Sequence, residues 1–210
     1  MFRDGTRMMY DAAHMAAPFF TLKGKTLVLI DWANVFHAQR KNGWNVDTRK
    51  LFTLFKNHQE VQDIVLFHGT DQHEKSASFL TAQAAIGYRI VTKAVKKVPV
   101  TVDHEGKLLA KPILRRKCDF DVEIAKEILL SLDTYQGFIL VSGDGDYAPI
   151  FDALRERRKQ AILVFPKGGL GREYIEDEQR KQAVFLCSLE RLRPFIETKN
   201  IPAGPKSRRA

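Results

Sequence analysis

Short, continuously apolar segments alternate with longer stretches of helical periodicity along this chain. The segments from Thr26 to Ile30 (TLVLI), from Ile64 to Phe67 and from Phe138 to Val141 lack the polar–apolar alternation of a strand with one solvated face. Strands of this kind are buried on both faces, and strands that are separated by helices form βαβ units with right-handed crossovers. The sequence therefore predicts an α/β fold with a mostly parallel central sheet.

The remaining elements follow from periodicity and from turn and capping residues. Further strands are expected at 88–95, 98–102, 107–113, 161–165 and 183–187, and helices from Asp47 onward, at 73–86, from Asp121 onward, at 148–159 and at 188–192. A turn at 104–106 would join two of these strands into a hairpin at an edge of the sheet. In the helix that Asp121 is expected to cap, the residues predicted to face the core are Val122, Ile124, Ala125, Ile128 and Leu129.

The chain of 210 residues is long enough for one domain with a core. We expect a flexible leader at 1–24, a folded domain at 25–196 and a flexible basic tail at 197–210. No segment approaches the roughly 18 consecutive apolar residues that a membrane span requires, so no membrane partner is expected. Cys118 and Cys187 are too few for a disulfide framework, which favours a reducing, cytoplasmic location.

The net charge of +9 favours a polyanionic partner, because each phosphate that a Lys or Arg neutralises releases condensed counterions. The basic residues cluster at 93–97, 115–117, 155–159 and 206–209. Charge alone does not separate RNA from DNA.

Acidic side chains follow two of the predicted central strands. Asp31 comes directly after the first strand, with Asn34 close behind it, and the segment Ser142-Gly143-Asp144-Gly145-Asp146 follows the strand at 138–141. A third source of carboxylates is Asp119 and Asp121, at the start of an amphipathic helix. In parallel sheets, ligands bind beyond the carboxyl ends of the strands, where the strand order reverses. These side chains are therefore expected to share one cleft.

Carboxylates held close together repel one another, and a hard divalent cation relieves that repulsion. Mg²⁺ and Mn²⁺ prefer such oxygen ligands and share them with substrate phosphates, whereas the six histidines show no zinc-ligand spacing. Each element also has an ordinary interpretation: Asp31 and Asp121 as helix N-caps, and the segment at 142–146 as a turn. The combination favours a Mg²⁺ or Mn²⁺ site.

The motifs Asp31-x-x-Asn34, Asp121-Val122-x-Ile124-Ala125 and Ser142-Gly143-Asp144-Gly145-Asp146-Tyr147-x-Pro149-Ile150 resemble the NYN domain, the LabA-like branch of the PIN-like nuclease superfamily. The resemblance covers about residues 25 to 195, and the last motif is its most specific part. It implies a Rossmann-like three-layer α/β/α sandwich and a Mg²⁺- or Mn²⁺-dependent ribonuclease site that acts on RNA.

The resemblance also assigns roles. The residues that would bind metal and carry catalysis are Asp31, Asp121, Asp144 and Asp146. Asn34 and Ser142 would orient ligands or water, with Asp119 as a competitor for one metal position and Glu127 as a supporting acid. Independently of the resemblance, the basic side chains expected near the RNA phosphates are Lys93, Lys117, Lys167 and Arg172, the last two flanking the glycine-rich segment 168–171. The ordinary interpretation of Lys93 and Lys117 is a solvated surface lysine. His68 and Asp71 are further candidates for lining the cleft.

Three alternatives remain open at this point. The chain could be a catalytically weak RNA-binding or regulatory module, a small-molecule phosphohydrolase, or a protein-interaction scaffold with a structural cation. The haloacid-dehalogenase type of phosphohydrolase needs an Asp at the second position after its nucleophile, where this chain has Ala33. A homodimer is also left open.

Overall fold

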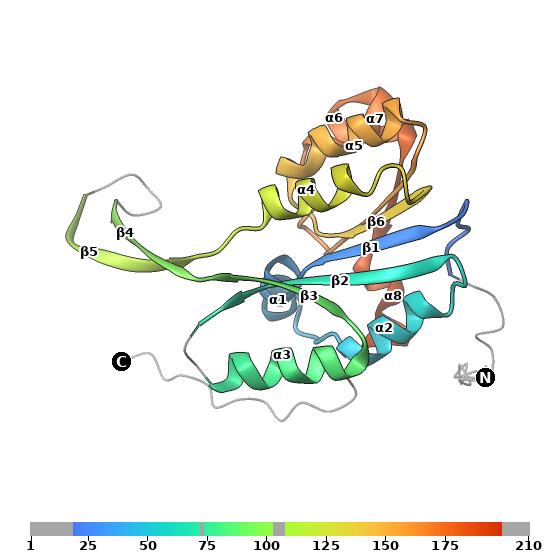
Figure 1. Ribbon diagram of the computed structural model, residues 1–210. Helices are drawn as coiled ribbons and strands as arrows, with labels where there is room; N and C mark the ends of the chain where they lie inside the picture. The colour runs from blue at the N-terminus through green and yellow to red at the C-terminus, as the bar shows by residue number, and fades with distance from the viewer. Residues whose placement is uncertain (1–18, 72–73, 103–107, 199–210) are drawn as a thin grey trace, which may run out of the picture.

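The computed structural model describes residues 19–71, 74–102 and 108–198. Its centre is a six-stranded sheet in which every neighbouring pair is parallel, with the strand order β3-β2-β1-β6-β7-β8 (Figure 1). The strands are β1 (Thr26–Asp31), β2 (Val61–Thr70), β3 (Arg89–Ala94), β6 (Gly137–Val141), β7 (Gln160–Phe165) and β8 (Val184–Ser188). The predicted α/β class with a mostly parallel sheet is confirmed.

Helices cover both faces of this sheet and complete the expected three layers. The apolar side chains of β1 alternate between two core clusters: Val28 and Ile30 face one cluster, and Leu27 and Leu29 face the other. The first cluster is covered by α1 (Trp32–Asn42), α2 (Thr48–Lys56), α3 (Glu74–Ile86) and α8 (Leu189–Ile196). The second is covered by α4 (Asp121–Leu130), η2 (Gly145–Tyr147), α5 (Ala148–Glu156) and α6 (Glu173–Glu176), which is followed by α7 (Glu178–Ala183). Two buried faces explain why β1 is continuously apolar.

The strand order reverses between β1 and β6. The chain adds β2 and β3 on one side of β1, then returns to place β6, β7 and β8 on its other side. Residues Leu29 and Ile30 lie in register with Leu140 and Val141, so the two strands end at the same level of the sheet. A doubly wound sheet binds its ligands at this reversal point.

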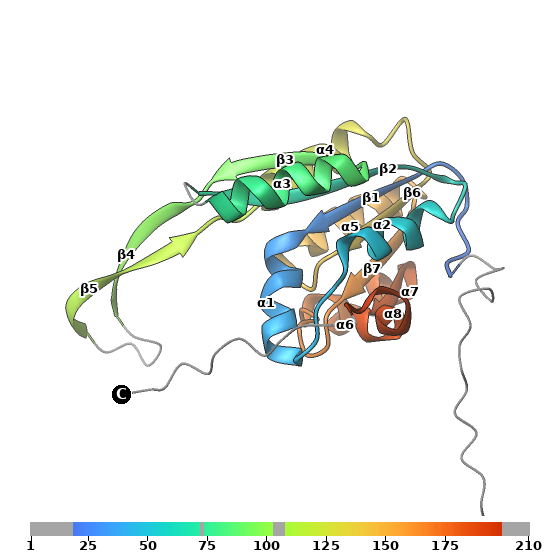
Figure 2. The same ribbon diagram turned by 90° about the horizontal axis from the view of Figure 1, so that it is seen from below.

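The predicted hairpin does not form an edge of the central sheet. The strands β4 (Lys96–Val102) and β5 (Leu108–Lys117) pair only with each other, as an antiparallel arm that projects away from the body (Figures 1 and 2). The edge is β3, and the single residue Val95 separates β3 from β4. The chain therefore leaves the sheet and enters the arm without a turn, while the predicted turn at 104–106 lies outside the described residues.

The predicted core face of α4 is partly wrong. Val122 is 74% exposed and Leu129 is 48% exposed, whereas Ile124 and Ile128 are buried. The buried side chains are Phe120, Ile124 and Ile128, which recur every four residues and so lie on one face of the helix. Val122, two residues from Phe120 and Ile124, lies on the solvent-exposed side. Asp121 is the first residue of the helix and not its cap; the capping position is Phe120, which makes no side-chain capping bond.

Several boundaries also differ from the expectation. The packed region begins before residue 25, because Phe20 is only 3% exposed and lies in the core. Helix α1, which the sequence did not predict, starts directly after β1. Helix α5 ends at Glu156, and α8 continues to Ile196 with Pro194 inside it. None of the described helices combines the length and apolar character needed to cross a membrane.

Candidate functional site

Asp31 joins the central strand to the first helix. It is the last residue of β1 and the N-cap of α1, where its Oδ1 accepts a hydrogen bond from the backbone N–H of Asn34 at 3.3 Å. The ordinary N-cap interpretation is therefore correct for this residue, and it does not exclude a second role. Asp31 is 8% exposed, which is low for a carboxylate without a described ion-pair partner.

The loop after β6 is tied to Asp31 and Asn34. The Ser142 hydroxyl reaches Asp31 Oδ2 at 3.5 Å, and the backbone N–H of Gly143 donates to Asn34 Oδ1 at 3.1 Å. Within the loop, the N–H of Asp144 donates to Ser142 Oγ at 3.2 Å, and the N–H of Asp146 donates to Asp144 Oδ1 at 3.1 Å. These bonds hold the polar residues of both strand ends against one another.

The pKa values show that carboxylates from three separate segments share this site. Burial raises the pKa of Asp31 to about 6, and the negative charges of Asp121 and Asp144 add to the rise. Burial also raises the pKa of Asp121, and the charges of Asp144, Asp119 and Asp146 act in the same direction.

Tyr147 lies beneath the acidic cluster, by which we mean Asp31, Asp121, Asp144 and Asp146. Its side chain is buried, and its hydroxyl makes no hydrogen bond of standard geometry within the described part of the chain. The hydroxyl nevertheless faces Asp121, where it partly offsets the rise in the pKa of that carboxyl group. Burial, together with the charges of Asp31 and Asp121, raises the pKa of the Tyr147 hydroxyl itself. Tyr147 therefore stays neutral, as a donor directed at the carboxylates.

A pre-formed metal cage is not part of this arrangement. Within the described ranges, no three side chains of His, Cys, Asp or Glu are already placed to bind one ion. Asp31 and Ser142 are buried, Asp121 and Asp144 are partly exposed, and Asp146 is exposed. The cluster thus runs from the interior to the surface, where a cation shared with a ligand would be reached by solvent.

The glycine-rich segment 168–171 supports the loop after β6 and does not resemble a phosphate-binding loop. The N–H of Gly171 donates to the carbonyl of Gly143 at 2.8 Å, and a Cβ on Gly143 would collide with the backbone of Gly169. The Tyr174 hydroxyl donates to the carbonyl of Asp144 at 2.8 Å. Close backbone contact between the two loops therefore requires glycine at position 143.

Two further candidates, Glu127 and Lys93, are engaged in ion pairs outside the cluster. Glu127 pairs with Arg89 at 2.6 Å, beside Asp63, and contributes to neither of the raised carboxyl pKa values. Lys93 pairs with Glu123 at 2.8 Å and also donates to the backbone carbonyl of Asp119 at 3.2 Å.

Lys117 lies 3.4 Å from the Asp119 carboxylate, so both of these exposed side chains border the cluster. Lys167 and Arg172 are exposed at the two ends of the glycine-rich segment, and the backbone N–H of Lys167 donates to Glu190 at 3.0 Å.

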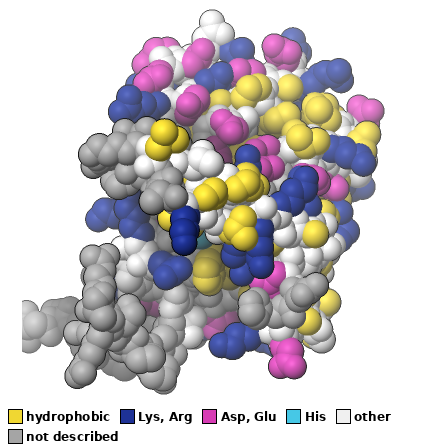
Figure 3. All heavy atoms as spheres, turned by 90° about the vertical axis from the view of Figure 1, so that its left-hand side faces the viewer, with side chains coloured by type: hydrophobic (Ala, Val, Ile, Leu, Met, Phe, Trp, Pro, Cys, Tyr) yellow, Lys and Arg dark blue, Asp and Glu magenta, His cyan; other side chains and the backbone are white. Residues whose placement is uncertain are grey.

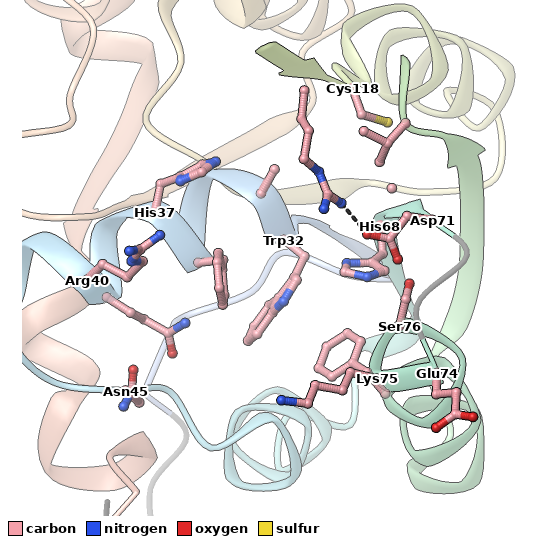
Figure 4. Close-up of a pocket in the computed structure, with 17 residues that line it drawn as sticks. Trp32, His37, Arg40, Asn45, His68, Asp71, Glu74, Lys75, Ser76 and Cys118 are labelled. Atoms are coloured by element: carbon pink, nitrogen blue, oxygen red, sulfur yellow. Dashed lines mark hydrogen bonds and ion pairs between the residues drawn. The ribbon is translucent and has the colours of Figure 1, made fainter. Parts of the chain in front are cut away.

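A groove of about 1240 Å³ lies beside the cluster. It is lined by α1, α3, the end of β2 and the base of the arm, and both His68 and Asp71 lie in it (Figure 4). The groove also contains aromatic residues that the sequence pattern did not indicate, among them Trp32, Phe36 and Phe79. Trp32 and Phe36 are four residues apart on α1, so they would have been found had the helix been predicted.

A doubly wound α/β/α sandwich with a carboxylate cluster at its strand-order reversal defines a Rossmann-like protein of the PIN-like kind. The chain matches the NYN domain over residues 25–185, well over half of its 210 residues. It therefore belongs to the NYN domain family, whose members are generally nuclease-like.

Two individual proteins are similar to this chain, one in sequence and one in fold. The chain is 27% identical over 177 residues to the low amplitude and bright protein LabA of Synechococcus elongatus, covering 83% of this chain and 89% of that protein. A crystal structure of a protein of unknown function from Vibrio parahaemolyticus has a similar fold, with a TM-score of 0.62 at 18% identity. That likeness covers 82% of this chain and 96% of the other.

Proposed function

We propose that this protein is a metal-dependent ribonuclease that hydrolyses RNA phosphodiester bonds at the Asp31 cluster. The observation that carries the proposal is the nearly buried carboxylate of Asp31 at the strand-order reversal, hydrogen-bonded to the Ser142 hydroxyl of the loop that carries Asp144 and close enough to Asp121 and Asp144 to be affected by their charges. A carboxyl group whose pKa is raised by burial and, to a smaller extent, by neighbouring charges is typical of a functional site.

The donor set fits Mg²⁺ or Mn²⁺. Hard cations prefer carboxylate oxygens, and Mg²⁺ is commonly bound by only one or two carboxylates together with waters and substrate phosphates. Such a site does not need three side chains already in place. Asp31, Asp121, Asp144 and Asp146 would hold the ion, which would supply an ionised water near neutral pH and offset charge on the phosphate oxygens.

The surrounding residues would fix the carboxylates. Asn34 and Ser142 connect Asp31 to the loop that carries Asp144, so the two strand ends keep their separation when a ligand binds. Tyr147 would donate to Asp121 and keep that carboxylate oriented. Asp119, at the surface beside Lys117, is the residue that could replace one carboxylate ligand.

The base of the arm supports an anionic substrate. Two basic clusters that are separate in the sequence come into register, with Lys96 opposite Lys117 and Lys97 opposite Arg116. Like charges directly opposite one another destabilise a strand pair, so an arm of this kind gains stability when a polyanion binds. Lys117 also borders the acidic cluster, which would bring a bound phosphate chain next to the carboxylates.

The test is cleavage of end-labelled RNA with and without Mn²⁺ by the wild type, Asp31→Asn and Asp146→Asn. Asp133→Asn is a matched control, because Asp133 is an exposed aspartate that takes no part in the cluster. We expect cleavage by the wild type and the control only with Mn²⁺, and a loss of at least about 100-fold in the two cluster variants.

Equal cleavage by all four proteins, or cleavage in EDTA, would refute the proposal. RNA binding without any Mn²⁺-dependent cleavage would instead identify a regulatory binding module. Hydrolysis of p-nitrophenyl phosphate without cleavage of RNA would identify a small-molecule phosphohydrolase.

A further inference from the structure

The groove beside the acidic cluster combines an aromatic floor with cationic walls. Trp32 stacks on Phe79 with ring centroids 5.3 Å apart and an interplanar angle of 28°, and Phe79 also contacts His68 at 4.9 Å. Burial lowers the pKa of His68, so at neutral pH this histidine is an uncharged member of the aromatic floor.

One aromatic ring of the groove remains available. Phe36 is 46% exposed, one helical turn after the nearly buried Trp32. Exposing a phenylalanine ring to water is unfavourable. Because Phe36 lies on the groove side of α1, its exposed ring can stack on a planar ligand in the groove.

The walls of the groove carry three basic side chains and the two acidic side chains of Asp71 and Glu74. Arg40 on α1 and Lys75 on α3 lie on opposite sides of it, and neither has an ion-pair partner among the described residues (Figure 4). Arg116, from the arm, closes a third side and pairs with Asp71. Figure 3 shows Lys and Arg side chains gathered on this face around a recess with apolar and histidine side chains inside it.

The groove borders the acidic cluster. Trp32 and Ala33 line it and directly follow Asp31 in the chain, while Cys118 lines it just before Asp119. A polymer bound in the groove would therefore lie next to the cluster.

We infer that this groove binds an unpaired nucleotide of single-stranded RNA, with its base stacked on Phe36 and its flanking phosphates near Arg40 and Lys75. The inference rests on the proposed function, to which it adds the form of the substrate. A volume of about 1240 Å³ exceeds the roughly 300–1,000 Å³ of ordinary small-molecule pockets, and so suits a segment of a polymer. Bases inside a duplex have no free face, so paired RNA would not use Phe36.

The test measures binding of a short fluorescein-labelled single-stranded RNA in EDTA, where cleavage is prevented, and of the same sequence as a duplex. Phe36→Ala is compared with Phe185→Ala, because Phe185 on the edge strand β8 is 52% exposed. A base–aromatic stack contributes enough that Phe36→Ala should weaken single-strand binding roughly 5- to 100-fold. Phe185→Ala and Phe36→Trp should bind like the wild type, and duplex binding should be unchanged in all variants.

A second readout locates the base itself. Single-stranded RNA with one 2-aminopurine should lose fluorescence on binding to the wild type at one position of the label, and keep it on binding to Phe36→Ala. Equal single-strand affinity of Phe36→Ala and Phe185→Ala would overturn the inference, as would a parallel loss of duplex binding in Phe36→Ala.

These outcomes are separate from those for the nuclease. Phe36-dependent binding without Mn²⁺-dependent cleavage would keep the groove assignment and reject the enzyme. Mn²⁺-dependent cleavage together with single-strand affinity that is unchanged in Phe36→Ala would keep the enzyme and reject the groove.

Discussion

Replacing Asp31 by Asn should make the metal-free protein more stable while removing its proposed activity. The Asp31 carboxylate is nearly buried among other carboxylates, so its charged form is unfavourable in the folded state. Asn keeps the shape and is as good an N-cap as Asp, so helix α1 should retain its first turn. The substitution therefore removes chiefly the charge.

The magnitude follows from the pKa. The folded-state pKa of about 6 lies above the ordinary value of 3.8, so the ionised group opposes folding once the pH exceeds that ordinary value. The stability that the protonated carboxyl group provides is complete below pH 3.8 and is lost as the pH rises through about 6. The free energy of unfolding of Asp31→Asn should therefore exceed that of the wild type by about 3 kcal/mol at pH 7.5 and by about 1 kcal/mol at pH 4.5.

The assay is urea unfolding of the wild type and Asp31→Asn in EDTA at the two pH values. We expect Asp31→Asn to unfold at higher urea at pH 7.5, with a much smaller difference at pH 4.5 and equal m-values. Saturating Mn²⁺ should reduce or reverse the difference, because it stabilises only a protein that binds it. An Asp31→Asn variant that is no more stable than the wild type at pH 7.5 would refute the reasoning.

Three further substitutions test the supporting structure, each by urea unfolding. Gly143→Ala should destabilise the protein by about 1–3 kcal/mol, because its Cβ meets the backbone of Gly169. Gly145→Ala should destabilise the protein clearly less, because its Cβ meets only the movable end of the Glu173 side chain. Equal losses of stability in the two variants would contradict this explanation. Glu127→Gln should cost about 0.2–1 kcal/mol and leave RNA cleavage unchanged, since Glu127 pairs with Arg89; lost cleavage would place it in the site. Phe20→Ala should cost about 3–5 kcal/mol, and an unchanged unfolding midpoint would show that residue 20 is dispensable.

The central sheet was predictable because its strands are buried on both faces. Continuous apolar segments such as Leu27–Ile30 have no other stable location in a protein of this size, and the helices between them require parallel pairing. The acidic candidates followed from the same logic, because strand ends on neighbouring parallel strands meet at one edge.

The errors arose where local pattern and tertiary contact disagree. Helix α1 was missed because its inner face includes the polar Gln39, whose Oε1 accepts a hydrogen bond from the backbone N–H of Val46 and so is satisfied by tertiary structure. The arm was expected at a sheet edge, because alternation within a hairpin does not show what the hairpin pairs with. Glu127 was chosen by its proximity to Asp121 in sequence, but six residues along a helix bring it to Arg89 instead.

The double position of Asp31, as the end of β1 and the cap of α1, limits how this protein could change over evolution. A copy released from any need to cut RNA would still have to satisfy the open N–H groups at the start of α1. Asn, Ser or Thr could do so without a charge, whereas an aliphatic residue would leave the first turn unsupported. Inactive descendants should therefore keep a small polar residue at position 31. In a related sequence, a polar residue at this position is weak evidence of catalysis, and only an aspartate there indicates nuclease activity.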